Sequence, residues 1–238
     1  MKRFLTLAIA LLLCFSTSAF LLACDDEPPV ETDAPNTEGS DTGETEQQTL
    51  SADIGLSKTE NYTLTLEGLM SVTKNGVDEG KSNMKQVLKI ANGKSELIMY
   101  GENENGEMEP TEGSIVLEGE MAKQQIEQSN KLLETILSKY GEFVYDTETK
   151  SYAITETIII EELMDGFEYD HESGNPIPIK IPTKITIADA TVTLTEDGKL
   201  LKIVCDYTQE MTMNGEVIIT SGINTWTVTD YGTTVIGS

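Results

Sequence analysis

The C-terminal part of the chain consists of three long runs of strand-type residues separated by short turn signals. The runs cover Lys184–Thr195, Lys199–Met213 and Glu216–Tyr231, and they are joined at Asp197-Gly198 and Asn214-Gly215. Because Asn-Gly and Asp-Gly supply the positive φ angles that two-residue hairpin turns need, the pattern predicts consecutive antiparallel strands. Strands this long twist strongly, so we expect the sheet that they form to be curved.

Shorter strand signals occupy the preceding region. Alternating residues and Asn-Gly turns predict strands at Asn61–Leu66, Met84–Ile90, Ser95–Tyr100 and Ser114–Glu118, and a hairpin formed by Phe143–Asp146 and Ser151–Ile154. The segment Thr157–Asp165 is compatible with a strand, because of its three successive isoleucines, or with a short helix ending before Gly166. Two acidic or polar loops are expected at 101–113 and 165–178.

One helix is predicted at Glu120–Tyr140. At 3.6 residues per turn its apolar residues form one stripe, with charged residues opposite; the stripe consists of Ala122, Ile126, Leu133, Leu137 and Tyr140, with Leu132 and Ile136 beside it. Glu127 and Lys131 are spaced for a favourable i,i+4 ion pair. Gly141 is expected to end the helix as a left-handed cap.

A helix with a single apolar stripe must bury it, and the only predicted surface that can cover it is the sheet. We therefore predict the α+β class, with a strongly curved antiparallel sheet (a half-barrel) wrapped around one long amphipathic helix. No internal repeat is visible, and residues 50–238 are predicted to form a single β-rich domain that is long enough to bury its own core.

The N-terminus has the form of an export signal. Lys2 and Arg3 precede an apolar stretch, and the stretch ends in Leu21-Leu22-Ala23-Cys24, which resembles the lipobox of bacterial lipoproteins. The resemblance implies that residues 1–23 are a signal peptide and that Cys24 carries a diacylglyceryl anchor on the extracytoplasmic face of a bacterial membrane. The alternative is an uncleaved transmembrane helix, since the stretch is long enough to span a bilayer. Polar residues within it and the lack of a basic stop-transfer cluster argue against that alternative.

Residues 24–49 are predicted to be a lipid-anchored, disordered linker. Between 25 and 49 the sequence has nine acidic residues and neither a basic nor an aromatic residue. Such a segment cannot bury enough apolar surface to offset its ordering entropy, and its like charges extend it. The whole chain has a formal net charge of −25. Phosphate backbones repel so acidic a protein, so nucleic acid is not expected as a partner.

The residues that usually carry catalysis or metals are scarce, so the sequence predicts no enzyme, no catalytic residue, no cofactor and no metal site. His171 is the only histidine, which excludes a site with two histidine ligands. A calcium-loop spacing at 101–112 has Gly101 where the first carboxylate should be. Cys205 is the only cysteine after Cys24 and alternates with Ile203 and Tyr207, so we expect a buried core residue.

The order of elements also resembles the LolA/LppX-type lipoprotein-carrier superfamily. The residues that carry the resemblance are Cys24 of the lipobox, the opening strand Asn61–Leu66, the helix Glu120–Tyr140 and the final meander ending at Thr229-Asp230-Tyr231-Gly232. It covers roughly residues 58–236. The resemblance implies an apolar cavity between sheet and helix that holds acyl chains. The ligand-binding candidates on the helix stripe are then Ile126, Leu133, Ile136, Leu137 and Tyr140.

Two functions follow from these patterns. The first is a membrane-anchored lipoprotein that binds or carries a lipid or another hydrophobic ligand in that cavity. Methionines suit the lining of adaptable apolar pockets, although they are equally suited to an ordinary core; they stand at positions 70, 84, 99, 108, 121, 164, 211 and 213. The alternative is a solid-core surface lipoprotein that binds an envelope protein or a glycan through the acidic loops. A hydrolase is the least supported class.

Overall fold

The computed structural model describes Leu50, Ile54, Leu56 and residues 60–236, apart from 104, 112, 170–175 and 214, and it describes no side chain between 165 and 178. The predicted signal peptide 1–23, the predicted anchor Cys24, the linker to residue 49 and His171 lie outside the described residues. The predictions made for them stay predictions.

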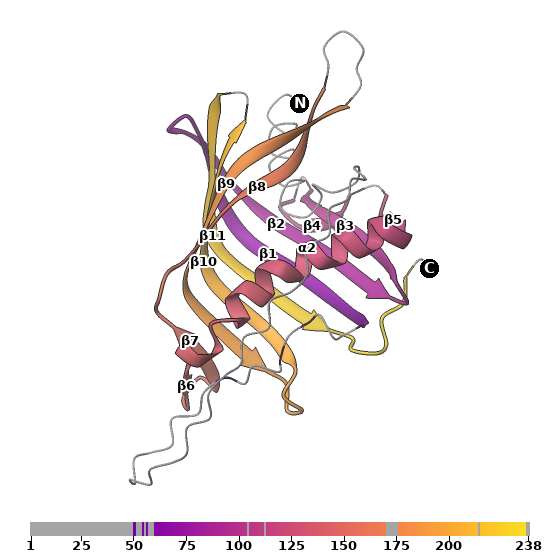
Figure 1. Cartoon of the computed structure of the whole chain (residues 1–238), viewed down its shortest axis with the longest axis vertical. Helices are drawn as coiled ribbons and strands as arrows, with labels where there is room; N and C mark the ends of the chain where they lie inside the picture. The colour runs from indigo at the N-terminus through magenta and orange to yellow at the C-terminus, as the bar shows by residue number, and fades with distance from the viewer. Residues whose placement is uncertain are drawn as a thin grey trace, which may run out of the picture.

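Most of the described chain forms one eleven-stranded antiparallel sheet. Its strands are β1 (Asn61–Lys74), β2 (Val77–Ala91), β3 (Lys94–Glu102), β4 (Met108–Pro110), β5 (Ile115–Glu118), β6 (Val144–Asp146), β7 (Ser151–Ile154), β8 (Ile158–Tyr169), β9 (Pro176–Leu194), β10 (Leu200–Met213) and β11 (Glu216–Thr229). Their spatial order is β4-β3-β2-β1-β11-β10-β9-β7-β6, with β5 also on β3 and β8 also on β9. The sheet is open and curved, and one α-helix lies across it (Figure 1). The predicted antiparallel sheet with a helix is therefore confirmed.

The predicted C-terminal meander is confirmed, and two neighbouring predictions need correction. β10 and β11 have nearly the predicted bounds, but β9 begins eight residues before Lys184. The segment Thr157–Asp165 is a strand and not a short helix, since β8 pairs with β9 from Ile158 to Tyr169. The predicted polar loop 165–178 therefore consists, at both ends, of paired strand residues.

The helix is shorter than predicted. α2 covers Gly119–Leu137 and is followed by a 3₁₀ turn, η3, at Tyr140–Glu142. Gly141 lies inside η3 and is not among the glycines with positive φ, so it does not act as the predicted left-handed cap. The helix instead ends at Ser138, whose backbone N–H donates to the carbonyl of Glu134.

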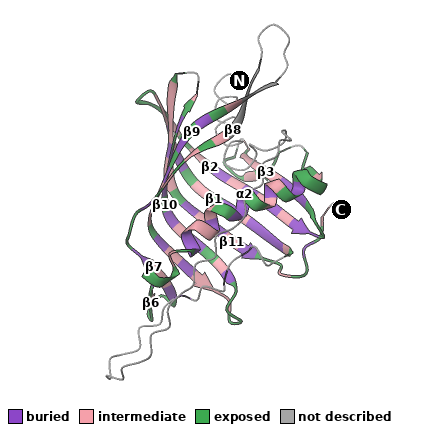
Figure 2. Cartoon of the chain, viewed as in Figure 1, coloured by how far each residue is buried: buried purple, intermediate pink, exposed green. Residues whose placement is uncertain are grey.

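The core lies between α2 and the face of the sheet that α2 covers. Along β1 the buried side chains alternate, and Tyr62, Leu64 and Leu66 belong to the same cluster as Leu133 and Ile136 of the helix. The opposite face of the sheet is rich in threonine and charged residues. Figure 2 shows this alternation as buried and less buried bands along the long strands, such as β1 and β10. One face of the sheet therefore carries nearly all of the apolar burial, as expected for an antiparallel sheet with one covered face.

Several strands continue past the helix (Figure 1). There, a second and smaller apolar cluster contains the buried Ile181 and Met211, with Ile179 and Met213 packed against them. We call the ends of β9 and β10 that carry these four residues the strand extension. All described members of this cluster come from β9 and β10, whereas the main core combines helix and sheet. The strand extension is thus a part of the sheet that α2 does not cover.

Three apolar residues from the start of the predicted domain also join the main core. Leu50 and Leu56 are almost completely buried, and Ile54 is buried beside them in the same cluster. The sequence analysis assigned no structural role to this stretch. Its isolated leucines and isoleucine have no strand or helix periodicity, so only the folded structure reveals that they are core residues.

Candidate functional site

The five predicted helix residues do not share one environment. Leu133, Ile136 and Leu137 are buried in the main core, and Ile126 is half-buried and packs against it. Tyr140 belongs to η3 instead of the helix and is 42% exposed. The structure therefore brings four of the five candidates to the sheet and leaves Tyr140 at the surface. The helix ends one turn too early to carry Tyr140 onto the stripe.

The middle of α2, from Gln125 to Asn130, faces the sheet with polar side chains that the sequence analysis missed. Ser95 Oγ on β3 donates a 2.6 Å hydrogen bond to Gln125 Oε1, and Tyr62 Oη on β1 donates to Asn130 Oδ1. All four residues are buried. Burial raises the pKa of the Tyr62 hydroxyl well above its usual value, so the group stays protonated as a donor. These pairs fix the helix at defined places on the sheet, because each would leave a buried polar atom unpaired if it broke.

The sheet supplies a second, largely apolar part of the same interior. Met70 and Met84 are buried in the main core, as are Cys205 and Trp226, and Met99 packs against it. Trp226 makes an edge contact with Tyr207, with ring centroids 6.1 Å apart. Burial, followed by the nearby Asp206 carboxylate, raises the pKa of the Cys205 thiol to about 12. Cys205 is therefore an unreactive core residue, which confirms the prediction made for it.

One amide is embedded among these apolar residues. Asn224 on β11 is only 2% exposed, and its Oδ1 accepts no hydrogen bond. It lies opposite Gly68 on β1, where an added Cβ would be 2.7 Å from that oxygen. A signal for Asn224 was present in the sequence, since it occupies the inward phase of the alternation that contains Trp226. On the helix, Ser129 Oγ is a second buried oxygen without a partner.

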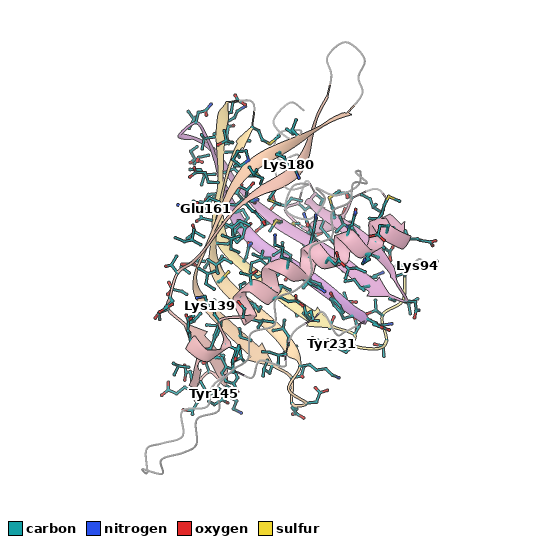
Figure 3. The ribbon with its side chains drawn as sticks, viewed as in Figure 1. Lys94, Lys139, Tyr145, Glu161, Lys180 and Tyr231 are labelled. Carbon is teal, nitrogen blue, oxygen red and sulfur yellow. The ribbon has the colours of Figure 1, made fainter. Side chains whose placement is uncertain are left out.

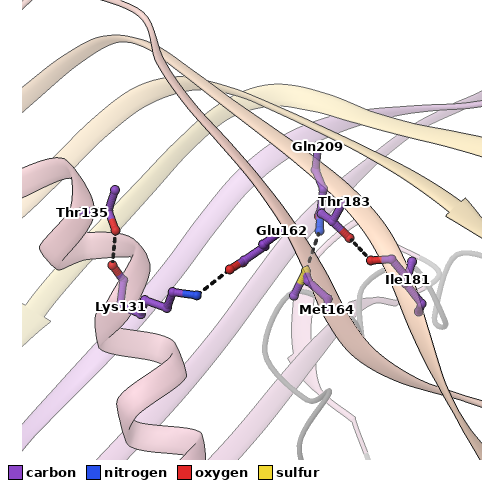
Figure 4. Close-up of polar contacts among 7 residues, drawn as sticks. All are labelled: Lys131, Thr135, Glu162, Met164, Ile181, Thr183 and Gln209. Atoms are coloured by element: carbon purple, nitrogen blue, oxygen red, sulfur yellow. Dashed lines mark hydrogen bonds and ion pairs between the residues drawn. The ribbon is translucent and has the colours of Figure 1, made fainter. Parts of the chain in front are cut away.

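A separate hollow lies at the other side of the structure, where β8, β9 and β10 run together. It has a volume of about 460 Å³ and is lined by Glu161, Glu162, Leu163, Pro182, Thr183, Lys184, Glu210 and Thr212. Lys184 Nζ lies 3.6 Å from Glu161, and Lys131 of α2 forms an ion pair with Glu162. Figure 4 shows this second pair bridging helix and strand, next to Gln209 Nε2, which lies 3.8 Å from Met164 Sδ. The expected pair of Lys131 with Glu127 is not formed; Glu127 lies near Lys123 instead.

Groups suited to metal binding or acid–base chemistry do not gather in this interior. Among the described residues, no cluster of three His, Cys, Asp or Glu side chains could hold a metal ion. Two carboxylates, those of Glu142 and Glu156, hydrogen-bond to each other at the surface. That contact raises the pKa of Glu156 and lowers the pKa of Glu142. Both side chains are solvent-exposed, outside the interior under α2.

The interior between α2 and the sheet is therefore lined by aliphatic, thioether and aromatic groups with a few polar atoms. In the described part of the chain, no helix has both the length and the apolar character that crossing a bilayer requires. No protein-family model matches the sequence, and no curated protein matches it either.

Proposed function

We propose that the protein is a membrane-anchored bacterial lipoprotein that binds a lipid or another hydrophobic ligand between its sheet and α2. In this proposal the sheet is a half-barrel that wraps a long amphipathic helix, as in the LolA/LppX-type carriers that the sequence resembles. The role is one of binding and not of catalysis. Leu133, Ile136, Leu137 and Ile126 contact the ligand from the helix side.

The observation that carries the proposal is the single apolar cluster shared by helix and sheet. It combines the helix residues with Met70 and Met84 from the facing strands, and the sheet around it is open and not closed into a barrel. Thioether side chains adapt to ligands of different shape, because they are unbranched and have several rotatable bonds. An open sheet with one covering helix can also admit a chain-like ligand without breaking strand pairing.

The buried Asn224 oxygen supports a more specific form of the ligand. Ligand sites are usually lined by apolar groups together with a small number of polar atoms that fix orientation. A buried acceptor without a donor costs about 1–3 kcal/mol, and an amide or hydroxyl hydrogen of a ligand would satisfy it. The ligand that fits is therefore an acyl chain with a hydrogen-bond donor.

The location forms part of the same proposal. Two acyl chains on Cys24 anchor a protein stably, since each buried CH₂ contributes about 0.8 kcal/mol. The acidic linker would hold the domain away from anionic headgroups, because the two surfaces repel each other. A carrier at the extracytoplasmic face could then collect its ligand from the membrane or from an envelope protein partner.

The experiment that tests the proposal is lipid extraction followed by mass spectrometry. The protein would consist of residues 25–238, which lack the lipidated cysteine and retain every described residue. Denaturation in organic solvent releases only ligands that are not covalently bound. We expect about one lipid per chain from the wild type, because the proposed interior forms a single ligand site. Ile126→Trp should retain severalfold less lipid, because the larger side chain occupies the interior.

The matched control is Met121→Trp, which adds the same indole at an exposed position of the same helix. It should retain the wild-type amount of lipid. Circular dichroism would verify that both variants are folded. A lipid-free wild type, or equal amounts of lipid in the two tryptophan variants, would contradict the proposal. The apolar residues of α2 would then be ordinary core residues.

The second candidate function, a surface interaction lipoprotein, is favoured by a different observation. Ile159 and Leu163 on β8 are large apolar side chains that are 56% and 63% exposed. Such residues gathered on one strand are typical of interaction surfaces. Binding at β8 is compatible with ligand binding under α2, since the two places use different residues.

A further inference from the structure

The strand β8 has an unpaired edge. It is twelve residues long and pairs with β9 along its whole length, from Ile158–Ile187 to Tyr169–Pro176. Within the described residues β8 has no second neighbour in the sheet. Its outer backbone N–H and C=O groups are therefore available to another extended chain.

The opposite edge of the sheet, at β3, is protected, unlike the edge at β8. There β3 is flanked by the short strands β4 and β5, and the backbone of α2 approaches β3 and β5 most closely. Lys94 at that edge forms a 2.5 Å ion pair with Glu118. Figure 3 shows Lys94 near the start of α2, and Glu161 on β8 at the other side of the molecule. The helix reaches β8 through the ion pair of Lys131 with Glu162.

β8 has acidic residues but lacks three other features with which proteins block an open edge. These are proline, lysine and bulges. β8 reads IIIEELMDGFEY and contains neither lysine, arginine nor proline, and its pairing with β9 has no register shift. A long regular edge without these features either aggregates or has a partner. The high net charge of −25 favours solubility and thus the second alternative.

The side chains on the outer face of β8 define what kind of partner fits. Ile159, Glu161 and Leu163 alternate on this face, and Glu161 is 72% exposed although Lys184 lies near it. The 460 Å³ hollow, with Glu161, Glu162 and Glu210 in its lining, lies directly beside them. A neighbouring strand would place its own alternating side chains against this apolar–acidic–apolar row.

We propose that β8 is a docking strand for an extended peptide segment of a partner protein, in which a lysine or arginine stands between two apolar residues. The segment adds to the sheet through main-chain hydrogen bonds, and the row Ile159–Glu161–Leu163 selects its side chains. A second copy of this chain fits less well, because antiparallel self-pairing would bring Glu161 and Glu162 of the two copies together. This inference is independent of lipid binding under α2.

The test uses the full chain in detergent and synthetic ten-residue peptides labelled with a fluorophore. One peptide contains valine-threonine-lysine-threonine-valine, and a second has glutamate in place of lysine. Fluorescence anisotropy should show saturable binding of the lysine peptide, and roughly three- to tenfold weaker binding of the glutamate peptide, as expected for opposite and like charges across a strand pair. Hydrogen exchange should slow for the amides of β8.

Charge reversal on the protein makes the test specific. Glu161→Lys should reverse the preference between the two peptides. Asp206→Lys is the matched control. Asp206 is an exposed acid on β10, on the same face of the sheet as Glu161 but away from β8. This variant should leave the preference between the two peptides unchanged. Three outcomes would overturn the proposal: no saturable binding, exchange protection on strands other than β8, or a preference that Glu161→Lys does not alter. A concentration-dependent dimer protected at β8 would assign the edge to a second copy instead.

Discussion

The helix-covered part of the sheet and the strand extension are built from the same strands but differ in what lies on their inner face. On β10, Cys205 and Tyr207 belong to the main core, whereas Met211, only four residues farther along, belongs to the small second cluster. Both parts of this strand have buried side chains on the inner face and pair with β9 and β11, although the register with β9 shifts between Val204 and Asp206. Strand pairing alone therefore does not define the core of this protein. The main core forms where α2 covers the sheet.

This contrast has a consequence for stability. In the helix-covered part, side chains from α2 and the sheet pack together with Leu50, Ile54 and Leu56, so loosening one affects many others. In the strand extension the described cluster joins residues from only two neighbouring strands. Regions with fewer buried apolar contacts open with smaller free energies than the global core. The extension should therefore open locally before the rest of the domain unfolds.

The largest effect is expected from truncating a core residue under the helix. Leu133→Ala should lower the free energy of unfolding by about 2–5 kcal/mol, since Leu133 is completely buried and leaves a cavity. Met211→Ala removes a residue that is equally buried, but in the strand extension, and should cost about 2 kcal/mol or less, because the site can collapse locally. Urea denaturation measures both values. Equal losses would mean that the two regions form one cooperative core.

A smaller effect is expected at a close backbone contact of the helix-covered part, where Gly222 pairs with residues of the main core. Gly222 on β11 lies opposite Met70, and a Cβ there would be 2.3 Å from the Leu69 carbonyl oxygen and 3.0 Å from Met70 Sδ. Gly222→Ala should therefore destabilise the protein by about 1–3 kcal/mol through overpacking. Gly141→Ala is the control, because nothing lies within 4 Å of the added methyl group. Thermal melts that show the same midpoint for both variants would disprove the close packing at Gly222.

The smallest effect is a difference in local opening along β10. Cys205 is buried, and its pKa of about 12 keeps the thiol protonated at pH 8, so alkylation requires an opening of the helix-covered part. In the double variant Cys205→Ala, Met211→Cys, the single remaining thiol of the mature domain reports on the strand extension. We expect alkylation of this thiol to be at least about tenfold faster, which corresponds to ~1.4 kcal/mol less opening free energy.

Mass spectrometry of iodoacetamide-treated samples would follow both reactions, with the rate in denaturant as the reference for a fully accessible thiol. The Cys205→Ala variant alone controls for the stability lost at that site. Slower alkylation at position 211 than at position 205 would reverse the comparison between the two regions.

The sequence by itself determined the elements whose residues repeat with a clear period. The long alternating runs with Asp-Gly and Asn-Gly turns specified β10 and β11, and the spacing of Leu133, Ile136 and Leu137 specified the buried side of α2. Cys205 was predicted to be buried because it shares the phase of Ile203 and Tyr207. In each case the local pattern and the tertiary environment agree, so the periodicity was sufficient.

The tertiary structure decided the features that depend on contacts between elements, such as buried polar residues and the pairing of β8. Gln125 and Asn130 are buried although they are polar, because Ser95 and Tyr62 lie opposite them and supply hydrogen bonds. β8 is a strand because β9 is long enough to pair with it beyond the rest of the sheet. Leu50 belongs to the core because the space between helix and sheet accepts it. Ser95 and Tyr62 lie far from Gln125 and Asn130 in the sequence, and a local pattern contains no information about contacts that only the folded chain brings together.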